Sequence, residues 1–340
     1  MLNQTINLHE NTPPHGMNDD APVSRVLKMV VEPEAAGQRI DNFLLTRLKG
    51  VPRSHVYRIL RTGEVRRNGG RVKAEDRLDA GDILRIPPIR LSSPDTVPIP
   101  ADSLRTQLES RILYEDEHIL VLDKPQGMAV HGGSGLRYGV IEGLRAIRPD
   151  ARFLELAHRL DRDTSGCLLI AKKRAALTSL HGQFRDDQIK KVYLALLVGE
   201  WAHKYWRVDA PLEKNTLRSG ERVVRVARDG KAAVTEFRRL ARHVGATLVE
   251  ARPVTGRTHQ IRVHAQTLGH PIAGDDRYGD ENLNRPLRQK GLRRLFLHAL
   301  ETRFTHPQTG KSLCIKAPLA VELQGFLDTL PVTNHKGTRG

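Results

Sequence analysis

The sequence of 340 residues has little cysteine and no long run of apolar residues. Its two cysteines, Cys167 and Cys314, exclude a disulfide framework and a zinc site built from cysteine. No stretch approaches the roughly 18 apolar residues of a membrane-spanning helix, which excludes a transmembrane protein. The N-terminus also lacks the basic, apolar and small-residue series of a secretory signal. We therefore expect a cytoplasmic protein.

Acidic residues are in deficit. They number 39 against 55 lysines and arginines, which leaves a formal net charge of +16. The hydrophobic fraction of 39% and the charged fraction of 28% are typical of a soluble globular chain. The excess positive charge favours a polyanionic partner, but composition alone does not distinguish RNA, DNA and a membrane surface.

The texture of the sequence predicts two structured parts. We expect a disordered tail over residues 1–24, a small module over 25–90, a linker rich in Pro, Ser and Asp over 91–110, a larger domain over 111–332 and a short tail over 333–340. The small module is strongly basic, because residues 38–90 hold thirteen lysines and arginines against six acidic residues, a net charge of +7. A solvated helical face is the alternative explanation of this charge.

The larger domain is predicted to mix strands and helices. Apolar runs predict strands, and apolar residues at helical spacing predict helices. The strands are expected at 119–122, 167–171, 193–198, 246–251 and 295–299, and the helices at 174–186, 257–268 and 319–329. Strands outnumber helices and do not alternate with them regularly, which argues against a doubly wound fold. We therefore predict an α+β fold with a mixed, mainly antiparallel sheet.

Two charged motifs are candidates for a catalytic site. The first, residues 158–166 (HRLDRDTSG), directly precedes the apolar strand at 167–171, where unpaired charges would be costly. The second, residues 256–264 (GRTHQIRVH), puts His259 and Arg262 on one face of the expected helix. An arginine there could pair with a carboxylate of the first motif and keep it ionised. The alternatives are a capped turn with surface ion pairs and a basic surface helix.

Other motifs carry less weight. The histidines His259 and His264 are five residues apart, which is not the spacing of a helical zinc pair, so we expect no metal. The glycine-rich stretch 131–135 lacks the lysine of a nucleotide-binding loop, although its backbone amides could meet a phosphate. Tyr193 follows two lysines and suits stacking on a base, and a core tyrosine is the alternative.

These motifs together resemble a known family. Residues 112–133, 158–172, 190–199 and 256–264 resemble, in the expected order, the motifs of the RluA-type pseudouridine synthases. Residues 38–87 resemble the small RNA-binding module named after a small-subunit ribosomal protein, the S-four-type or α-L module. The resemblance therefore implies a pseudouridine synthase catalytic domain preceded by an RNA-binding module.

The resemblance also implies an activity and roles for residues. Such an isomerase detaches uracil from its ribose, rotates it and rejoins it through C5. Asp161 would be the catalytic carboxylate, attacking C1′ of the ribose or C6 of the uracil, or abstracting a ribose proton. Arg262 would pair with Asp161, Tyr193 would stack on the uracil, and Arg159 would contact the displaced RNA. The isomerisation needs no cofactor and no metal.

The implied partner is 23S rRNA, free or within a large-subunit assembly intermediate, and neither DNA nor a membrane. The enzyme is expected to be a monomer that flips the target base out of folded RNA. The candidate phosphate-binding residues of the basic module are Arg58, Arg61, Arg66 and Arg67. Two alternatives stay open: a synthase for uridines of tRNA or of other rRNA, and a noncatalytic RNA-binding factor of ribosome assembly.

Overall fold

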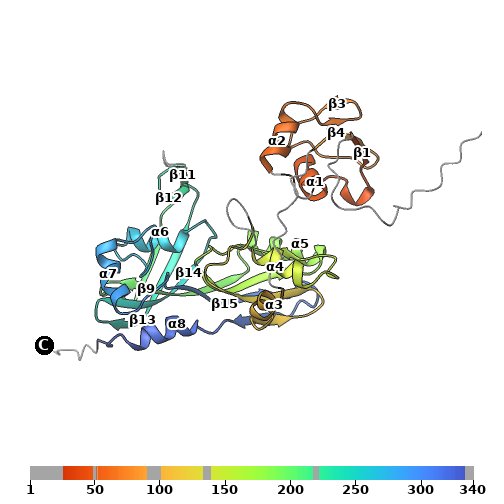
Figure 1. The fold of residues 1–340 in the computed structure, drawn as a ribbon. Helices are drawn as coiled ribbons and strands as arrows, with labels where there is room; N and C mark the ends of the chain where they lie inside the picture. The colour runs from red at the N-terminus through yellow and green to blue at the C-terminus, as the bar shows by residue number, and fades with distance from the viewer. Residues whose placement is uncertain are drawn as a thin grey trace, which may run out of the picture. The chain divides into compact units, whose positions relative to one another are not determined.

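The chain divides into two compact units, Met1–Pro98 and Ile99–Gly340. The computed structural model of the protein describes residues 26–48, 51, 53–89, 101–132, 139–216 and 222–333 (Figure 1). The expected N-terminal tail lies outside the described residues, and so does the expected C-terminal tail apart from Thr333.

The smaller unit is a four-stranded sheet with two helices. Its elements are β1 (Leu27–Val30), a 3₁₀ turn (Pro33–Ala35), α1 (Ile40–Arg47), α2 (Arg53–Arg61), β2 (Arg66–Arg67), β3 (Gly70–Arg71) and β4 (Ile83–Ile86). The strands pair in the antiparallel order β1-β4-β2-β3. Leu44 of α1, Ile59 of α2 and Leu84 of β4 are fully buried in one cluster, which is the core of this unit.

The first turn of α1 contains a carboxylate that bonds to α2. The residue in the N-cap position of α1 is Arg39. Asp41 lies within the first turn, nearly buried, and accepts hydrogen bonds from Arg39 and from the Tyr57 hydroxyl. Its carboxylate therefore ties α1 to α2.

The larger unit is built on a ten-stranded sheet (Figure 1). Its strands are β5 (Ile112–Glu115), β6 (Ile119–Lys124), β7 (Glu155–Leu156), β8 (Ser165–Ala171), β9 (Lys190–Val198), β10 (Tyr205–Asp209), β13 (Val234–His243), β14 (Ala246–Pro253), β15 (Leu297–Thr305) and β16 (Ser312–Lys316). The main path is β10-β13-β14-β9-β15-β8-β6-β5, with β16 on β15 and β7 on β8. Among the described strands only β8 and β15 pair in parallel, so the predicted mixed, mainly antiparallel α+β fold is confirmed.

Six helices and a hairpin complete the described part of the larger unit. They are α3 (Ala101–Glu109), α4 (Val140–Ile147), α5 (Arg174–Arg185), α6 (Gln260–Thr267), α7 (Glu281–Gln289), α8 (Val321–Asp328) and the hairpin of β11 (Leu212–Thr216) with β12 (Arg222–Val226). No helix in the described ranges is both long and apolar enough to cross a bilayer.

The middle strands of the sheet are buried on both faces. In β8, Leu168 and Ile170 face one apolar cluster, while Cys167 and Leu169 face another. The alternation of β6 is the same, and all its residues are buried. The apolar run at 167–171 therefore forms the doubly covered strand that its composition predicts, and Cys167 serves as a small packing residue.

The expected linker contains a helix. We predicted a linker over residues 91–110, but α3 occupies its second half and belongs to the larger unit. Leu104 and Leu108 are one helical turn apart and pack onto the core beside Gly143 of α4, and Leu108 is fully buried. The Pro, Ser and Asp content of the segment concealed this short apolar stripe.

The helix that carries the second motif is shorter than predicted. We expected it over residues 257–268, but α6 begins at Gln260. His259 stands just before it in a left-handed conformation with φ of 53°. His259 and Arg262 therefore do not share a helical face. The position of His259 relative to Arg262 is set by the turn before α6.

Candidate active site and RNA interface

Asp161 lies in a tight turn at the mouth of β8. The Thr164 amide donates to the Asp161 carbonyl and closes the turn, and β8 begins at Ser165. The Asp161 side chain keeps 25% of its surface exposed, although β8, the strand that follows the turn, is buried. This position lets a carboxylate stand against the core and still be reached from solvent.

A buried lysine holds the loop around Asp161. Lys124 is completely buried at the end of β6, and its Nζ donates to the carbonyls of Pro125, Met128 and Arg162 over 2.8–3.0 Å. Burial lowers the Lys124 pKa to about 7. The sequence gives no direct sign of this role, because the three acceptors are backbone atoms.

Arg262 is held mainly by a carboxylate that the sequence analysis missed. Its Nε and Nη2 each donate to one oxygen of Asp275 over 2.8 Å, and its Nη1 lies 3.5 Å from Oδ2 of Asp161. Burial works to lower the Arg262 pKa, but the pairing with Asp275 raises it overall. The predicted proximity of Arg262 and Asp161 is present in the structure, and Asp275 fixes the guanidinium in place.

His259 is a second neighbour of the Asp161 carboxylate. Its Nε2 lies 3.7 Å from Oδ1 of Asp161, while its Nδ1 is 2.7 Å from the hydroxyl of Tyr278. Burial lowers the His259 pKa, and Asp161 acts in the opposite direction. The two oxygens of Asp161 therefore face two different nitrogen groups.

Gln260 explains why α6 begins where it does. Its side-chain amide donates to the Val234 carbonyl and the Thr235 hydroxyl, while its oxygen accepts from the Thr255 hydroxyl and the Arg257 amide. The first two bonds tie the first turn of α6 to β13, and the other two tie it to the segment that precedes the helix. Arg262 is therefore presented to Asp161 from a fixed helix start.

Tyr193 lies on β9 and is buried rather than exposed. Only 9% of its surface is accessible, and it belongs to the main apolar cluster. Burial raises its pKa, and the nearby charge of Asp161 adds to the rise. The ring is thus a core tyrosine with its polar end within electrostatic reach of Asp161.

The other predicted residue near Asp161 points outward. Arg159, two positions before Asp161, is exposed. Within the described part of the chain it has no ion pair, so its guanidinium is available to a ligand.

The sheet of the smaller unit carries a row of basic side chains. Four residues lie directly opposite one another across its four strands, and we call them the basic row: Lys28, Arg85, Arg66 and Arg71. Opposed residues share a face of a sheet, and the alternate residues Leu84 and Ile86 are buried on the other face. Of these four residues only Arg66 was predicted to bind phosphate, because the register between short strands is not visible in the sequence.

The predicted RNA-binding arginines differ in their surroundings. Arg67 donates to Asp79 and pairs with Asp82, both over 2.6 Å, so its charge is neutralised within the unit. Arg58 pairs with Glu64 over 3.0 Å. Arg61 and Arg66 have no carboxylate partner among the residues that the structure describes.

In the described ranges no three His, Cys, Asp or Glu side chains are grouped to hold a metal ion. In the glycine-rich stretch 131–135, Gly133–Gly135 lies outside the described residues. The described amide of Gly132 donates to Glu142, as does that of Gly139. These two amides therefore hold a carboxylate of the protein itself.

Two family models match the chain. One, described as "RNA pseudouridylate synthase", matches residues 118–267, which include Asp161, Tyr193 and Arg262. The other, described as "S4 domain", matches residues 38–84. The catalytic motifs and the basic module thus fall in two separate families.

Relatives match over nearly the whole length. "Ribosomal large subunit pseudouridine synthase C" of Pasteurella multocida is 57% identical over 92% of this chain and 96% of its own. The protein of that name from Escherichia coli K12 is 56% identical over 92% and 99%. Among solved structures, "Human RNA Pseudouridylate Synthase Domain Containing 4" has a TM-score of 0.56 at 28% identity, covering 69% of this chain and 98% of its own.

Proposed function

This chain belongs to the RluA-type pseudouridine synthases, and from that membership we propose that it converts specific uridines of 23S rRNA, the large-subunit ribosomal RNA, to pseudouridine. The substrate follows from relatives above 55% identity that are named for the large ribosomal subunit. The observation that carries the activity is the accessible carboxylate of Asp161, with Arg262 on one oxygen and His259 on the other.

Asp161 is the catalytic carboxylate of the proposed mechanism. Attack on C1′, attack on C6 and abstraction of a ribose proton all require it to be ionised and fixed in direction. Arg262 supplies a permanent positive charge 3.5 Å away, and Asp275 prevents that charge from turning elsewhere. The reaction breaks the bond from C1′ to N1 of the uracil and forms one from C1′ to C5, while C5 loses a proton and N1 gains one. Because the oxidation state does not change, side chains alone can carry the reaction.

The uracil has to leave the RNA stack before Asp161 can reach its sugar. Extrusion costs on the order of a few kcal/mol, which contacts with the flipped base and the displaced strand offset. We assign Tyr193 to the uracil, with its ring stacking on the base and its hydroxyl handling the proton at C5. Arg159 is assigned to the displaced RNA, because it is exposed and close to Asp161.

The smaller unit holds the RNA backbone in this proposal. The basic row presents four cations on one exposed sheet face, and Arg61 adds another from α2. Arg58 contributes once it leaves Glu64. Arg67 is given a structural role instead, because it already pairs with two carboxylates. Such contacts position the enzyme without reading sequence.

We further propose that the enzyme acts as a monomer in the cytoplasm, on 23S rRNA or a large-subunit assembly intermediate and not on DNA. The two-unit fold already contains the carboxylate, its partners and a basic surface. Gel filtration of the free protein tests the monomer, and competition by duplex DNA for labelled rRNA tests the choice of nucleic acid.

The test of the activity is Asp161→Asn, which keeps the shape of the side chain and removes its charge. Release of tritium from rRNA labelled at C5 of uridine reports the reaction. The wild-type protein should release tritium, while Asp161→Asn should release none and still bind rRNA. Full activity of the variant would overturn the proposed role of Asp161. An inactive wild-type protein that binds rRNA would favour a noncatalytic assembly factor.

A further inference from the structure

We propose that Tyr278 is a positioning residue that acts on Asp161 through the imidazole of His259. The inference rests on the proposed catalytic role of Asp161. The hydroxyl of Tyr278 lies 2.7 Å from Nδ1 of His259, and Nε2 of His259 lies 3.7 Å from the carboxylate of Asp161. Tyr278, His259 and Asp161 are thus connected by two successive contacts.

The direction of the hydrogen bonds follows from the backbone. The amide of Val224 in β12 donates to the Tyr278 hydroxyl oxygen over 3.0 Å. That oxygen is thereby an acceptor, and its own hydrogen is directed to the other neighbour, Nδ1 of His259. An Nδ1 that accepts leaves the hydrogen of the neutral ring on Nε2, the nitrogen that faces Asp161. Tyr278 therefore selects the tautomer that can donate to the carboxylate.

The surroundings hold Tyr278 in that position. The residue is 5% exposed, and its ring packs 5.0 Å from the Arg262 guanidinium carbon. Its backbone amide donates to the same carboxylate of Asp275 that grips Arg262. The turn from Asp275 to Tyr278 therefore supports both neighbours of Asp161: Asp275 holds Arg262, and Tyr278 holds His259.

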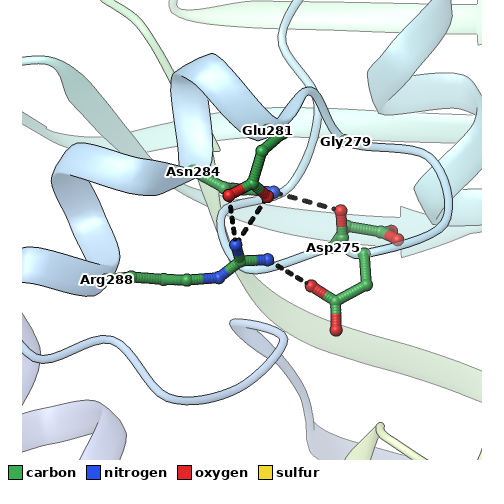
Figure 2. Close-up of a pocket in the computed structure, with 6 residues that line it drawn as sticks. Asp275, Gly279, Glu281, Asn284 and Arg288 are labelled. Carbon is green, nitrogen blue, oxygen red and sulfur yellow. Dashed lines mark hydrogen bonds and ion pairs between the residues drawn. The ribbon is translucent and has the colours of Figure 1, made fainter.

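A second set of contacts fixes the turn from behind. The Asn284 side chain donates to the Asp275 carbonyl and accepts from the Gly274 amide. Figure 2 shows Asn284 pointing to the Asp275 backbone, in a hollow of about 380 Å³ that Asp161 does not line. A Cβ on Gly279 would stand 2.3 Å from the Asp275 carbonyl oxygen, so this turn admits only glycine there. The turn that carries Tyr278 is therefore rigid, and it fixes the position of the Tyr278 hydroxyl.

The arrangement assigns His259 a task at Asp161. Arg262 engages Oδ2 and His259 approaches Oδ1, so both oxygens are restrained and the carboxylate cannot rotate freely. The charged and titratable groups that face His259 are Asp161, Arg262, Asp275, Arg277 and Tyr278. The distance of 3.7 Å is long for a hydrogen bond in the free enzyme, and we infer that it shortens when the flipped uridine excludes water.

The kinetic test removes one oxygen atom. Tyr278→Phe keeps the ring against Arg262 and deletes the hydroxyl, and Tyr205→Phe, at an exposed tyrosine of β10, is the matched control. With saturating rRNA, Tyr278→Phe should lower the single-turnover rate by about tenfold, with unchanged rRNA affinity. Tyr205→Phe should match the wild type. A wild-type rate in Tyr278→Phe would overturn the proposal.

A second variant separates positioning from general structural damage. His259→Gln places an amide N–H near the position of Nε2 and has no Nδ1 to accept from Tyr278. The loss caused by Tyr278→Phe should therefore disappear when His259 is already glutamine. If the double variant instead multiplies the two losses, Tyr278 does not act through His259.

The tautomer itself can be read without substrate. In protein labelled with ¹⁵N-histidine, the signal of His259, assigned by its absence in His259→Gln, should show the Nε2–H form when neutral. In Tyr278→Phe the signal should shift toward a mixture of tautomers. A neutral Nδ1–H form in the wild type would contradict the inference. Because no RNA is involved, this result stands apart from the tritium-release test of the proposed function.

Discussion

A single carboxylate, Asp275, accounts for the position of Arg262. Its side chain is fully shielded from solvent and accepts two bonds from the guanidinium, while its neighbour Asp276 is 83% exposed and pairs with Arg288. Asp275→Asn leaves a buried guanidinium without its main partner and should lower the free energy of unfolding by about 3–5 kcal/mol.

Asp276→Asn is the matched control, one residue away, and should change stability little. Urea denaturation of both variants checks the prediction. Equal stability of the two variants would show that Asp275 does not hold Arg262 as a buried ion pair.

Two histidines with lowered pKa values, the half-buried His158 and the fully buried His298, predict how stability depends on pH. Burial lowers the pKa of His158 and of His298 to about 4, from an ordinary value of 6.5. Nε2 of His158 accepts from the Leu169 amide, and Nδ1 of His298 lies 2.9 Å from the Ser165 hydroxyl, so both rings fit as neutral groups. Between pH 6.5 and 4 the unfolded chain binds protons that the folded protein does not. The free energy of unfolding therefore decreases as the pH is lowered through this window.

The expected slope is about 1.4 kcal/mol per pH unit for each histidine within that window. Urea denaturation between pH 7 and 5 measures it. His298→Gln should flatten the decline, while His181→Gln, at an exposed position, should not change it. A decline that His298→Gln leaves as steep would contradict this assignment.

At the scale of elements, one glycine sets the contact between β8 and β15. Gly166, five residues after Asp161, has φ of 106°, and a Cβ there would stand 2.3 Å from the Ala299 carbonyl oxygen. Gly245 also has a positive φ, of 76°, but has no atom within 4 Å of such a Cβ. Comparing Gly166→Ala with Gly245→Ala therefore isolates the clash from the backbone strain.

Gly245→Ala should cost about 1–2 kcal/mol of stability through its backbone conformation alone. Gly166→Ala should cost clearly more and should also lower activity, because the turn of Asp161 leads directly into β8. Thermal unfolding and tritium release measure the two effects. Equal costs would mean that β15 yields to the added methyl group.

Elements with continuous apolar runs could be predicted from the sequence, and those with mixed composition could not. The strand at 167–171 was predicted correctly, because a strand buried on both faces consists of a continuous apolar run. By contrast, α7 is polar overall, with Pro286 within it and only two leucines, and β13 is interrupted by Arg238 and Arg239, so neither contains a continuous apolar run. Their structure depends on neighbours that composition does not reveal.

The candidate site, like the fold, could be predicted only in part from the sequence. Charges crowded beside a buried strand pointed to residues 158–166, and the second motif pointed to an arginine that could pair with a carboxylate there. The family resemblance singled out Asp161 and Arg262 as that pair. Asp275 and Tyr278 were missed because a turn after α6 brings them back beside that helix, and such a return is a tertiary effect. The left-handed backbone of His259 was likewise beyond a helical reading.

At the scale of the whole molecule, the net charge of +16 is concentrated in one part of the sequence. Residues 38–90 hold +7 of it, and the basic row gathers three arginines from β2, β3 and β4. Replacing these three, Arg66, Arg71 and Arg85, with Gln should weaken rRNA binding and lower the slope of log affinity against log salt by about 2–3.

The matched control lowers the net charge equally at exposed sites elsewhere. It replaces three ion-paired arginines of the larger unit with Gln: Arg185, Arg288 and Arg303. Filter binding over a range of salt should give this variant a slope close to that of the wild type. If both triple variants lose the same slope, net charge rather than the basic row governs binding.

The central claim is that the Asp161 site of this protein makes pseudouridine in large-subunit rRNA. Pseudouridine mapping of total RNA from a strain lacking the gene, complemented with the wild type or with Asp161→Asn, tests it directly. Certain 23S positions should be unmodified in the deletion strain, restored by the wild type and not restored by Asp161→Asn. Unchanged 23S rRNA in the deletion strain, or restoration by Asp161→Asn, would contradict the account, and losses confined to tRNA would reassign the substrate.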